Sequence, residues 1–317
     1  MTAESDSGNM NLATTGMPVT RLPVTSLLIV ATIAYEVSFQ SSWQSYTEHI
    51  RVLVAEAAEQ GADVLVFPEY FSMELASLYG EPVYQSLDQQ LHAMQACLDD
   101  FIELFSQLAR EMGVYILAGS FPVRLQETGP DVFVNRAYWC SPEADGQLQW
   151  QDKLIMTRFE REEWLISPGS ELKVLDSRFG KVGVNICYDS EFPLLARRQV
   201  EQGANLLLVP SCTDTLAGFY RVQIGCRARA LENQCFVVQS PTVGLARWSP
   251  AIDENIGAAC VYGLVDQGFS PDGLVSEGGI NQPGWVYAEL DLSRIEAVRQ
   301  GGQVTNFDDW VHQQAYL

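Results

Sequence analysis

Residues 182–193, Val-Gly-Val-Asn-Ile-Cys-Tyr-Asp-Ser-Glu-Phe-Pro, contain the pattern from which the fold and the function are predicted. The apolar run 182–186 is typical of a buried strand. Phe192-Pro193 then opens a predicted helix over 194–203, since proline favours the first helical turn. Cys187 therefore lies at a strand-to-helix turn, where backbone N–H groups at the helix start favour a developing negative charge. This is the setting that a nucleophile needs.

The composition is that of a folded, acidic protein. Hydrophobic residues make up 47% and aromatic residues 10% of the 317 positions, enough for a sizeable core. Lys and Arg total 19 against 40 Asp and Glu, a net charge of −21. This balance argues against a nucleic-acid partner and against an anionic membrane surface. No apolar run reaches the ~20 residues of a membrane span.

Residues 1–24 are predicted to be a flexible leader. The segment 1–16 is polar and lacks a basic stretch followed by an apolar one, so it does not match a signal peptide. The 7 cysteines are odd in number and form no C-x-x-C pair, which disfavours a disulfide framework or a zinc ribbon. These features favour a reducing cytoplasm.

Alternating apolar strands and amphipathic helices predict an α/β architecture. The helix over 43–60 is expected to end at Gly61, because glycine is the common residue after a helix terminus. The segments 132–140 and 147–153 are predicted to form a hairpin. The other predicted helices are 89–111, 194–203, 220–233 and 293–299, and the other predicted strands are 26–35, 64–67, 114–120, 172–176, 181–186, 205–209, 235–239, 258–264 and 285–291.

Two segments of the chain echo each other. EQGADVLVFPE at 59–69 and EQGANLLLVPS at 201–211 each read as a helix end, a Gly-Ala turn, an apolar strand and a proline. No Ser/Gly linker or low-complexity block separates the halves. We therefore predict one domain, residues 25–317, built from two pseudo-symmetric units.

Three residues with complementary chemistry occur at or just past the ends of apolar strands: Glu69, Lys153 and Cys187. A lone cysteine is usually a small buried hydrophobe, so the functional interpretation depends on all three. A thiol is only slightly ionised at neutral pH and needs a base to act as a nucleophile. A partly desolvated carboxylate can be that base, and a lysine can stabilise an oxyanion.

Histidine is the usual base for a cysteine, but the three histidines are poorly placed for that role. His49 and His92 fall on predicted helix faces, and His312 is near the end of the sequence. We interpret them as surface residues. A protease-type Cys–His dyad is therefore disfavoured.

Three stretches, in order, are similar to signatures of the nitrilase superfamily of carbon–nitrogen hydrolases. They are GADVLVFPE at 61–69, QDKLIMTRFE at 151–160 and GVNICYDSEFP at 183–193. The resemblance continues through GANLLLVPS at 203–211, RARALENQCFVVQS at 227–240, GFSPDGLV at 268–275 and VYAELDL at 286–292.

The resemblance implies a four-layer α-β-β-α sandwich and assigns a role to each residue of the triad. Glu69 would be the general base, Lys153 would help to hold the tetrahedral oxyanion, and Cys187 would be the nucleophile. The backbone N–H of Tyr188 would complete the oxyanion hole. It also implies dimers or larger assemblies, so we expect at least a homodimer.

Many family members carry a second glutamate after the lysine, four residues before an aromatic. Glu160 and Trp164 meet that spacing, so Glu160 is chosen over Glu162 and Glu163 to position the nucleophile or the substrate amide. Tyr70 and Ser211 are further candidates for substrate binding. The helix that carries Arg227 and Glu232 is interpreted as structural packing beside the site.

Departures from the family pattern bear on the substrate. Gln151 replaces a frequent aromatic, which affects only pocket shape. Tyr188-Asp189 follows the cysteine where nitrilases usually have Trp-Glu, so amide hydrolysis is favoured. Ser190 and Glu191 stand where the branch acting on N-carbamoyl-D-amino acids has carboxylate-binding arginines, which disfavours that substrate. Glu191 and the acidic surface suit a neutral or cationic amide.

The sequence thus predicts an amidase that acts on a small amide or N-carbamoyl amine without a cofactor or metal. Nitrile hydrolysis or acyl transfer on the same triad is an alternative, and a non-catalytic binding subunit is another. The loops 70–80, 211–218 and 245–256 are expected to line the pocket, but their sequences do not identify the substrate.

Overall fold

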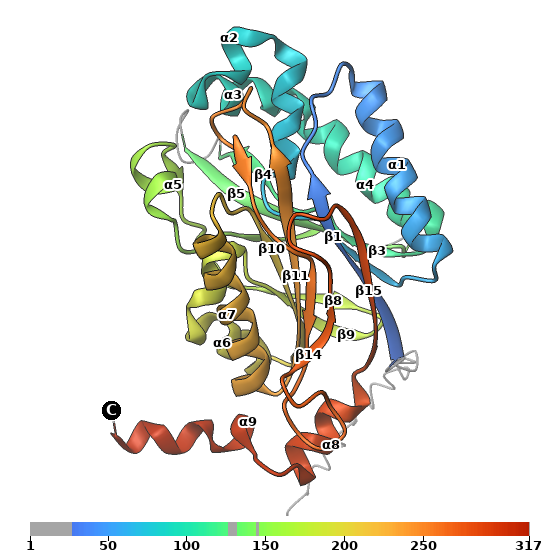
Figure 1. Ribbon diagram of the computed structural model, residues 1–317, viewed down its shortest axis with the longest axis vertical. Helices are drawn as coiled ribbons and strands as arrows, with labels where there is room; N and C mark the ends of the chain where they lie inside the picture. The colour runs from blue at the N-terminus through green and yellow to red at the C-terminus, as the bar shows by residue number, and fades with distance from the viewer. Residues whose placement is uncertain (1–26, 126–131, 144–145, 317) are drawn as a thin grey trace, which may run out of the picture.

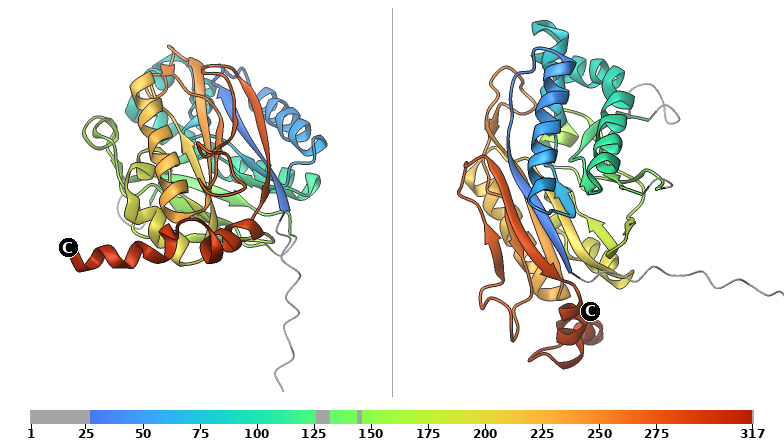
Figure 2. Two further views of the ribbon diagram at one scale, coloured as in Figure 1. Left: turned by 60° about the horizontal axis from the view of Figure 1, so that its bottom comes forward. Right: turned by 90° about the vertical axis from the view of Figure 1, so that its right-hand side faces the viewer.

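The computed structural model describes residues 27–125, 132–143 and 146–316. The predicted leader, 1–24, lies outside these ranges. Two β-sheets pack face to face, and helices cover the outer face of each (Figures 1 and 2). The predicted α-β-β-α sandwich is confirmed.

The first sheet is built on three parallel strands, β1 (Leu27–Glu36), β2 (Val64–Val66) and β3 (Tyr115–Leu117). β15 pairs antiparallel with β1, so the first and last strands are neighbours. The strands that complete this sheet are β4 (Phe121–Arg124), β5 (Phe133–Cys140), β6 (Gln149–Asp152), β7 (Ile166–Ser167) and β15 (Gly284–Asp291).

The second sheet repeats the plan with β9 (Gly180–Val184), β10 (Ala204–Ser211) and β11 (Phe236–Leu245), again all parallel. The two sheets join where Tyr35 and Glu36 of β1 pair with Thr242 and Val243 of β11. The remaining strands are β8 (Val174–Ser177), β12 (Glu254–Asn255), β13 (Cys260–Tyr262) and β14 (Leu274–Glu277).

Helices α1 (Trp43–Glu59) and α4 (Leu98–Met112) cover the first sheet, and α6 (Pro193–Glu201) and α7 (Leu216–Asn233) cover the second (Figure 1). The shorter helical segments are η1 (Phe71–Tyr79), α2 (Glu81–Tyr84), α3 (Leu87–Met94), η2 (Gln95–Cys97), α5 (Arg158–Glu162), η4 (Cys187–Glu191), α8 (Ser293–Gly301), α9 (Asn306–Asp309) and η5 (Trp310–Tyr316).

Alternation along β2 explains why its sequence is continuously apolar. Val64 and Val66 pack in one buried cluster with residues of the second sheet, such as Val182. Leu65 and Phe67 pack in another, which includes residues of α1 and α4. Both faces of the strand are therefore covered, as is typical of parallel sheets.

The two echoing segments occupy equivalent positions. Each contributes the end of a helix, a glycine with positive φ (Gly61 at 81° and Gly203 at 101°) and then the middle parallel strand of its sheet, β2 or β10. The strand order β3-β2-β1-β11-β10-β9 places the two units side by side. The predicted pseudo-symmetry is confirmed.

The predicted helix over 89–111 is wrong in one respect, because it is interrupted. α3 and α4 are separated by the 3₁₀ turn η2. The side chain of Gln95 donates to the Pro122 carbonyl and accepts from the Arg124 N–H. It therefore joins the 3₁₀ turn to the backbone of β4. Such a tertiary contact leaves no trace in the hydrophobic pattern.

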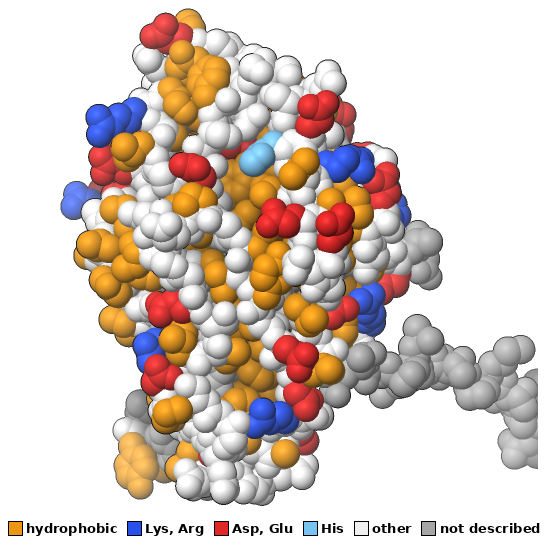
Figure 3. Space-filling model, turned by 45° about the vertical axis from the view of Figure 1, so that its right-hand side comes forward, with side chains coloured by type: hydrophobic (Ala, Val, Ile, Leu, Met, Phe, Trp, Pro, Cys, Tyr) orange, Lys and Arg blue, Asp and Glu red, His pale blue; other side chains and the backbone are white. Residues whose placement is uncertain are grey.

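The charged surface is mixed. Figure 3 shows acidic side chains dispersed over one face, interspersed with fewer basic ones. Within the described part of the chain, no helix combines the length and apolar character needed to cross a bilayer.

Gly119 permits the close approach of the loop that follows β2. Its φ is +52°, and a Cβ at this position would lie 2.1 Å from the Pro68 carbonyl oxygen and 2.6 Å from the Phe71 ring. Only glycine tolerates both the backbone conformation and the contact. The position of Glu69, next to Pro68, therefore depends on Gly119.

We predict that Gly119→Ala lowers the free energy of unfolding by about 3 kcal/mol, because backbone strain and steric overlap add. Gly113→Ala is the matched control, since Gly113 has φ +70° but its Cβ would meet nothing within 4 Å. That variant should lose only about 1 kcal/mol. Urea unfolding measures both, and equal losses would contradict the proposed overlap.

Candidate active site

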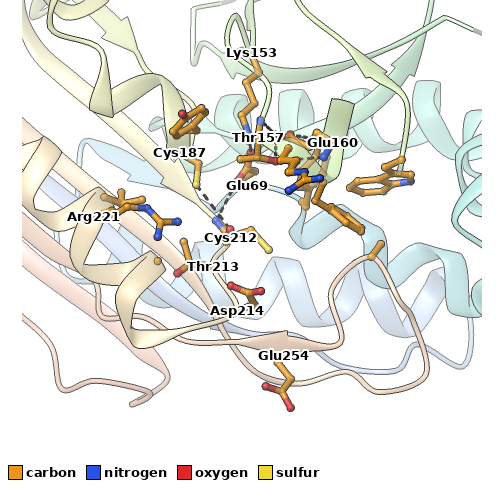
Figure 4. Close-up of a pocket in the computed structure, with 18 of the residues that line it drawn as sticks. Glu69, Lys153, Thr157, Glu160, Cys187, Cys212, Thr213, Asp214, Arg221 and Glu254 are labelled. Atoms are coloured by element: carbon orange, nitrogen blue, oxygen red, sulfur yellow. Dashed lines mark hydrogen bonds and ion pairs between the residues drawn. The ribbon is translucent and has the colours of Figure 1, made fainter. Parts of the chain in front are cut away.

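Glu69, Lys153 and Cys187 converge on one cavity of about 360 Å³ (Figure 4). Glu69 follows β2, Lys153 follows β6, and Cys187 begins η4 after β9. All three side chains are buried. The strand-end positions seen in the sequence therefore meet at the same place, although the residues are far apart along the chain.

The Lys153 ammonium bridges two carboxylates. Its Nζ lies 2.8 Å from Glu69 Oε1 and 2.6 Å from Glu160 Oε2, with about 1% of the side chain exposed. Burial alone would lower the pKa of Lys153, but the charges of Glu160 and Glu69 outweigh it and raise that pKa. The lysine is therefore held as a cation.

Both carboxylate oxygens of Glu69 accept hydrogen bonds, which hold the side chain in place. Oε1 accepts from Lys153 and from Asn135 Nδ2 at 2.9 Å, and Oε2 accepts from the Cys212 backbone N–H at 3.0 Å. Burial raises the pKa of Glu69 to about 6, although Lys153 opposes the rise. A carboxylate with that pKa is suited to general-base work near neutral pH.

The nucleophile loop, residues 187–191 with the predicted nucleophile Cys187, has an unusual backbone. Cys187 has φ 49° and Tyr70, next to Glu69, has φ 55°, both in the left-handed region. Such conformations cost about 1–3 kcal/mol for non-glycine residues and cluster at functional sites. The Ser190 hydroxyl donates to the Cys187 carbonyl at 2.6 Å and helps to hold the turn. Cys187 Sγ lies 3.8 Å from the Cys212 carbonyl oxygen.

The thiol of Cys187 is protonated at rest. Burial raises its pKa well above the usual value, the charge of Glu69 adds to the rise, and Lys153 opposes it. The arrangement therefore favours removal of the proton during attack over a standing thiolate.

Glu160 is positioned by its own helix and by Tyr70. Thr157 caps α5 and donates from its backbone N–H and its hydroxyl to Glu160 Oε2, at 2.9 and 2.8 Å. Tyr70 OH donates to Oε1 at 2.7 Å, and the Tyr70 ring packs against Trp164. Burial raises the pKa of Glu160, but Lys153 outweighs it and the net shift is downward. Glu160 thus balances the lysine charge.

Sequence reasoning used Asp189 only as an indicator of the substrate class and did not assign it to the site, although it lies two residues after Cys187. Its carboxylate accepts from the backbone N–H groups of Leu154 and Ile155, the latter at 2.8 Å. Burial raises the pKa of Asp189 to about 7. The side chain therefore ties the segment after Lys153 to the nucleophile loop. Asn135 was missed too; its only sequence signal is its place in the predicted hairpin with the lysine strand.

The structure corrects the assignment of Ser211 to the cavity. Ser211 does not line the cavity; its hydroxyl is buried and donates to the Ser240 carbonyl between β10 and β11, while Cys212 faces the cavity. The helix that carries Arg227 and Glu232, α7, packs against η4; its Arg229 donates to the Ser190 carbonyl at 2.9 Å, whereas Arg227 lies at the surface.

The mouth of the cavity carries charge of both signs. Tyr188 lines it, and Glu191 forms an ion pair with Arg221 at 3.4 Å. Among the cavity-lining residues that the structure describes there is no histidine. No group of three or more potential ligands among the described residues could hold a metal ion.

A sequence model of carbon–nitrogen hydrolases matches residues 29–300. The chain belongs to this family. Among curated relatives of this carbon–nitrogen hydrolase, the probable hydrolase YhcX of Bacillus subtilis is 33% identical over 280 residues, 88% of the chain but 53% of the relative. The chain thus spans about half the length of that protein. The omega-amidase NIT2-B of Xenopus laevis is 31% identical over 258 residues, 78% of the chain and 83% of the relative.

Solved structures share the fold of this hydrolase. Nit3 of Saccharomyces cerevisiae, a member of the nitrilase superfamily, superposes with a TM-score of 0.67 at 24% identity, covering 88% of this chain and 95% of Nit3. The NitFhit protein of C. elegans superposes with a TM-score of 0.70 at 22% identity, and the match covers 87% of this chain and 64% of NitFhit.

Lys153→Met would leave Glu69 and Glu160 of this carbon–nitrogen hydrolase buried without their cation. We expect the free energy of unfolding to fall by about 3–5 kcal/mol near pH 8. The loss should be smaller near pH 5, because burial raises the pKa of unpaired carboxyls and protonation then removes the buried charges. Urea unfolding at the two pH values measures the difference.

Lys173→Met is the control, since the Lys173 side chain is partly exposed and its Nζ lies 3.8 Å from Glu171 Oε2. Its effect should stay within about 1 kcal/mol at both pH values. A pH-independent loss in Lys153→Met would mean that the two carboxylates do not depend on this cation.

Proposed function

We propose that this enzyme is an amidase that cleaves the C–N bond of a small amide or N-carbamoyl amine through a thioester on Cys187. The observation that carries the proposal is the pairing of a buried thiol with Glu69, a carboxylate whose pKa is raised to about 6, in a cavity beside the buried Lys153 cation. The general base, the nucleophile and the charge for an oxyanion are then within one site.

In the first half-reaction, Glu69 takes the thiol proton while sulfur attacks the carbonyl carbon. The negative charge on the carbonyl oxygen is stabilised by the Lys153 ammonium and by the Tyr188 backbone N–H. As the tetrahedral adduct collapses, protonated Glu69 gives its proton to the leaving nitrogen. Ammonia or an amine departs, and the acyl group remains on sulfur.

In the second half-reaction, Glu69 takes a proton from water, and the resulting hydroxide attacks the thioester. Collapse expels the Cys187 sulfur, which recovers a proton from Glu69. The sum is an amide plus water giving a carboxylic acid plus ammonia or an amine. Glu160 keeps the lysine charge balanced, so Glu69 remains basic enough for both steps.

The cavity and the relatives support a small substrate. About 360 Å³ lies at the lower end of the usual range for small-molecule sites. Several curated relatives are named omega-amidases, which supports an amide over a nitrile. Asp214, Asp253 and Glu254 join Glu191 at the cavity mouth, a charge balance that suits a neutral or cationic amide.

Cys187→Ala should abolish turnover and leave the fold intact, because the thiol is small and its 3.8 Å contact with the Cys212 carbonyl is weak. Release of ammonia from short amides, omega-amides and N-carbamoyl amines measures activity, and circular dichroism checks the fold. Cys140→Ala, at a buried cysteine in β5, is the control and should retain activity. Intact mass should show an acyl adduct on the wild type and none on Cys187→Ala.

Hydrolysis by Cys187→Ala at the wild-type rate would refute the thioester mechanism. Ammonia release from a nitrile but from no amide would favour the nitrilase alternative. Capture of the acyl group by an added amine would favour acyl transfer. A folded wild type that forms no adduct with any of these compounds would favour the non-catalytic alternative.

We also propose a homodimer that forms through the outer face of the second sheet. Exposed apolar side chains follow a helical stripe on α7, at Leu216, Tyr220, Ile224 and Leu231, beside Leu194 of α6. Such a contiguous stripe is typical of a surface that another subunit covers, and a second copy of the chain presents the same stripe. Residues 25–317 would form each subunit's single domain, and its cytoplasmic location remains a prediction of the sequence.

Ile224→Asp should convert the dimer to a monomer, because a charge would be buried at the centre of the stripe. Val52→Asp on α1 is the matched control, since the two side chains are 65% and 64% exposed. Light scattering after size exclusion measures the mass. An unchanged mass for Ile224→Asp would place the interface elsewhere.

A further inference from the structure

Asn135 is fully buried on β5, and its hydrogen bonding is incomplete. Nδ2 donates to Glu69 Oε1 at 2.9 Å, while Oδ1 has no hydrogen-bond partner among the described residues. Burying an amide with an orphaned acceptor is unfavourable. The side chain's one hydrogen bond within the described structure is thus to the proposed base, which links Asn135 to the site through Glu69 alone.

The two oxygens of Glu69 face different partners. Oε1 is shared by Asn135 and Lys153, whereas Oε2 accepts from the Cys212 N–H. Cys187 Sγ approaches the carbonyl of the same Cys212 residue. Oε2 and the thiol therefore share Cys212 as a neighbour, whereas Asn135 and Lys153 hold the other oxygen of Glu69.

A neutral donor at this place has a specific advantage. Lys153 is shared with Glu160 and, in the proposed mechanism, also turns toward the oxyanion, so its hold on Glu69 weakens during the reaction. Asn135 can keep Glu69 oriented through that change. Because the amide is uncharged, it suppresses the basicity of Glu69 less than a second cation would.

We infer that Asn135 is a positioning residue, which holds Glu69 with Oε2 toward the Cys187 thiol throughout the reaction. The backbone supports the same geometry, because the Asn135 carbonyl accepts from the Lys153 N–H at 2.8 Å. Asn135 of β5 thus contacts both Glu69, through its side chain, and the backbone of Lys153, through its carbonyl. The inference rests on the proposed function, since it assigns a role within that mechanism.

The other groups around Glu69 come from four elements. They are Lys153 after β6, Glu160 on α5, Cys187 on η4, Cys212 after β10 and Tyr70 next in the chain. None of these changes in an Asn135 variant. A shift in the pH profile can therefore be assigned to the lost amide.

Asn135→Leu removes the hydrogen-bond donor to Glu69. Asn135→Asp replaces the amide with a carboxylate, which has the same negative charge as Glu69 and nearly the same volume as the amide. Both changes destabilise the Glu69 carboxylate and raise its pKa, so the base is protonated over a wider acidic range. In the pH profile of kcat/KM, we expect the acidic limb to move to higher pH by about one pH unit for Asn135→Leu, and by more for Asn135→Asp. kcat near neutral pH should fall about tenfold or more with KM little changed.

Asn233→Leu is the matched control. Asn233 is also fully buried, its Nδ2 donates to the Arg229 carbonyl at 3.1 Å, and its Oδ1 is likewise without a partner among the described residues. We expect this variant to lose thermal stability as the Asn135 variants do, but to leave the acidic limb of the pH profile of kcat/KM in place. Iodoacetamide alkylation of Cys187 across pH gives a second readout that needs no substrate.

The outcomes separate the two proposals. A wild-type Cys187 that iodoacetamide does not modify would overturn the proposed function itself. A reactive wild type, with either folded Asn135 variant keeping the wild-type pH limb in both assays, would overturn the role of Asn135 alone. If Asn135→Leu does not fold, Asn135→Asp decides, because it preserves the side-chain volume.

Discussion

The buried Lys153 ammonium is the interaction on which the rest of the site depends. A cation with about 1% of its side chain exposed is tolerated only if anions surround it, and Glu69 and Glu160 supply them at 2.8 and 2.6 Å. Those carboxylates lie 84 and 7 residues away in the chain. Forming this bridge therefore requires that β2, β6 and α5 be brought into one arrangement.

Several other features serve this bridge. Arg136 of β5 and Asp152 of β6 form a bidentate ion pair. This pair helps to fix the register between the two strands, and Lys153 directly follows Asp152. Asp189 ties the backbone after Lys153 to the nucleophile loop. Burial raises the pKa of Glu69 to about 6, Lys153 opposes the rise, and the negative charge of Glu160 adds to it. The site thus separates a structural carboxylate from a basic one through their different hydrogen bonds.

The local pattern of the sequence was sufficient for the α/β class and the two similar units, whereas the four-layer sandwich was implied by the resemblance to the nitrilase superfamily. The apolar runs at 64–67 and 205–209 identified two strands, and the repeated Gly-Ala-strand-Pro segments identified the two units. The placement of Glu69, Lys153 and Cys187 at strand ends followed from the same pattern. The interruption at Gln95 did not, because a side chain bonded to β4 ends the helix and both flanking segments keep helical periodicity.

What the sequence by itself determined is therefore the α/β class, the two similar units and the strand ends that carry the candidate residues, since hydrophobic periodicity and turn residues act over a few positions; the order of the layers was implied only by the family resemblance. Only the tertiary structure decided which polar side chains join them. Asn135 reaches Glu69 across 66 residues and Asp189 reaches Ile155 across 34. Ser211 belongs to the sheet and Cys212 to the cavity because side chains alternate along a strand. Hydrogen bonds of this kind depend on three-dimensional register, which residue type and spacing do not specify.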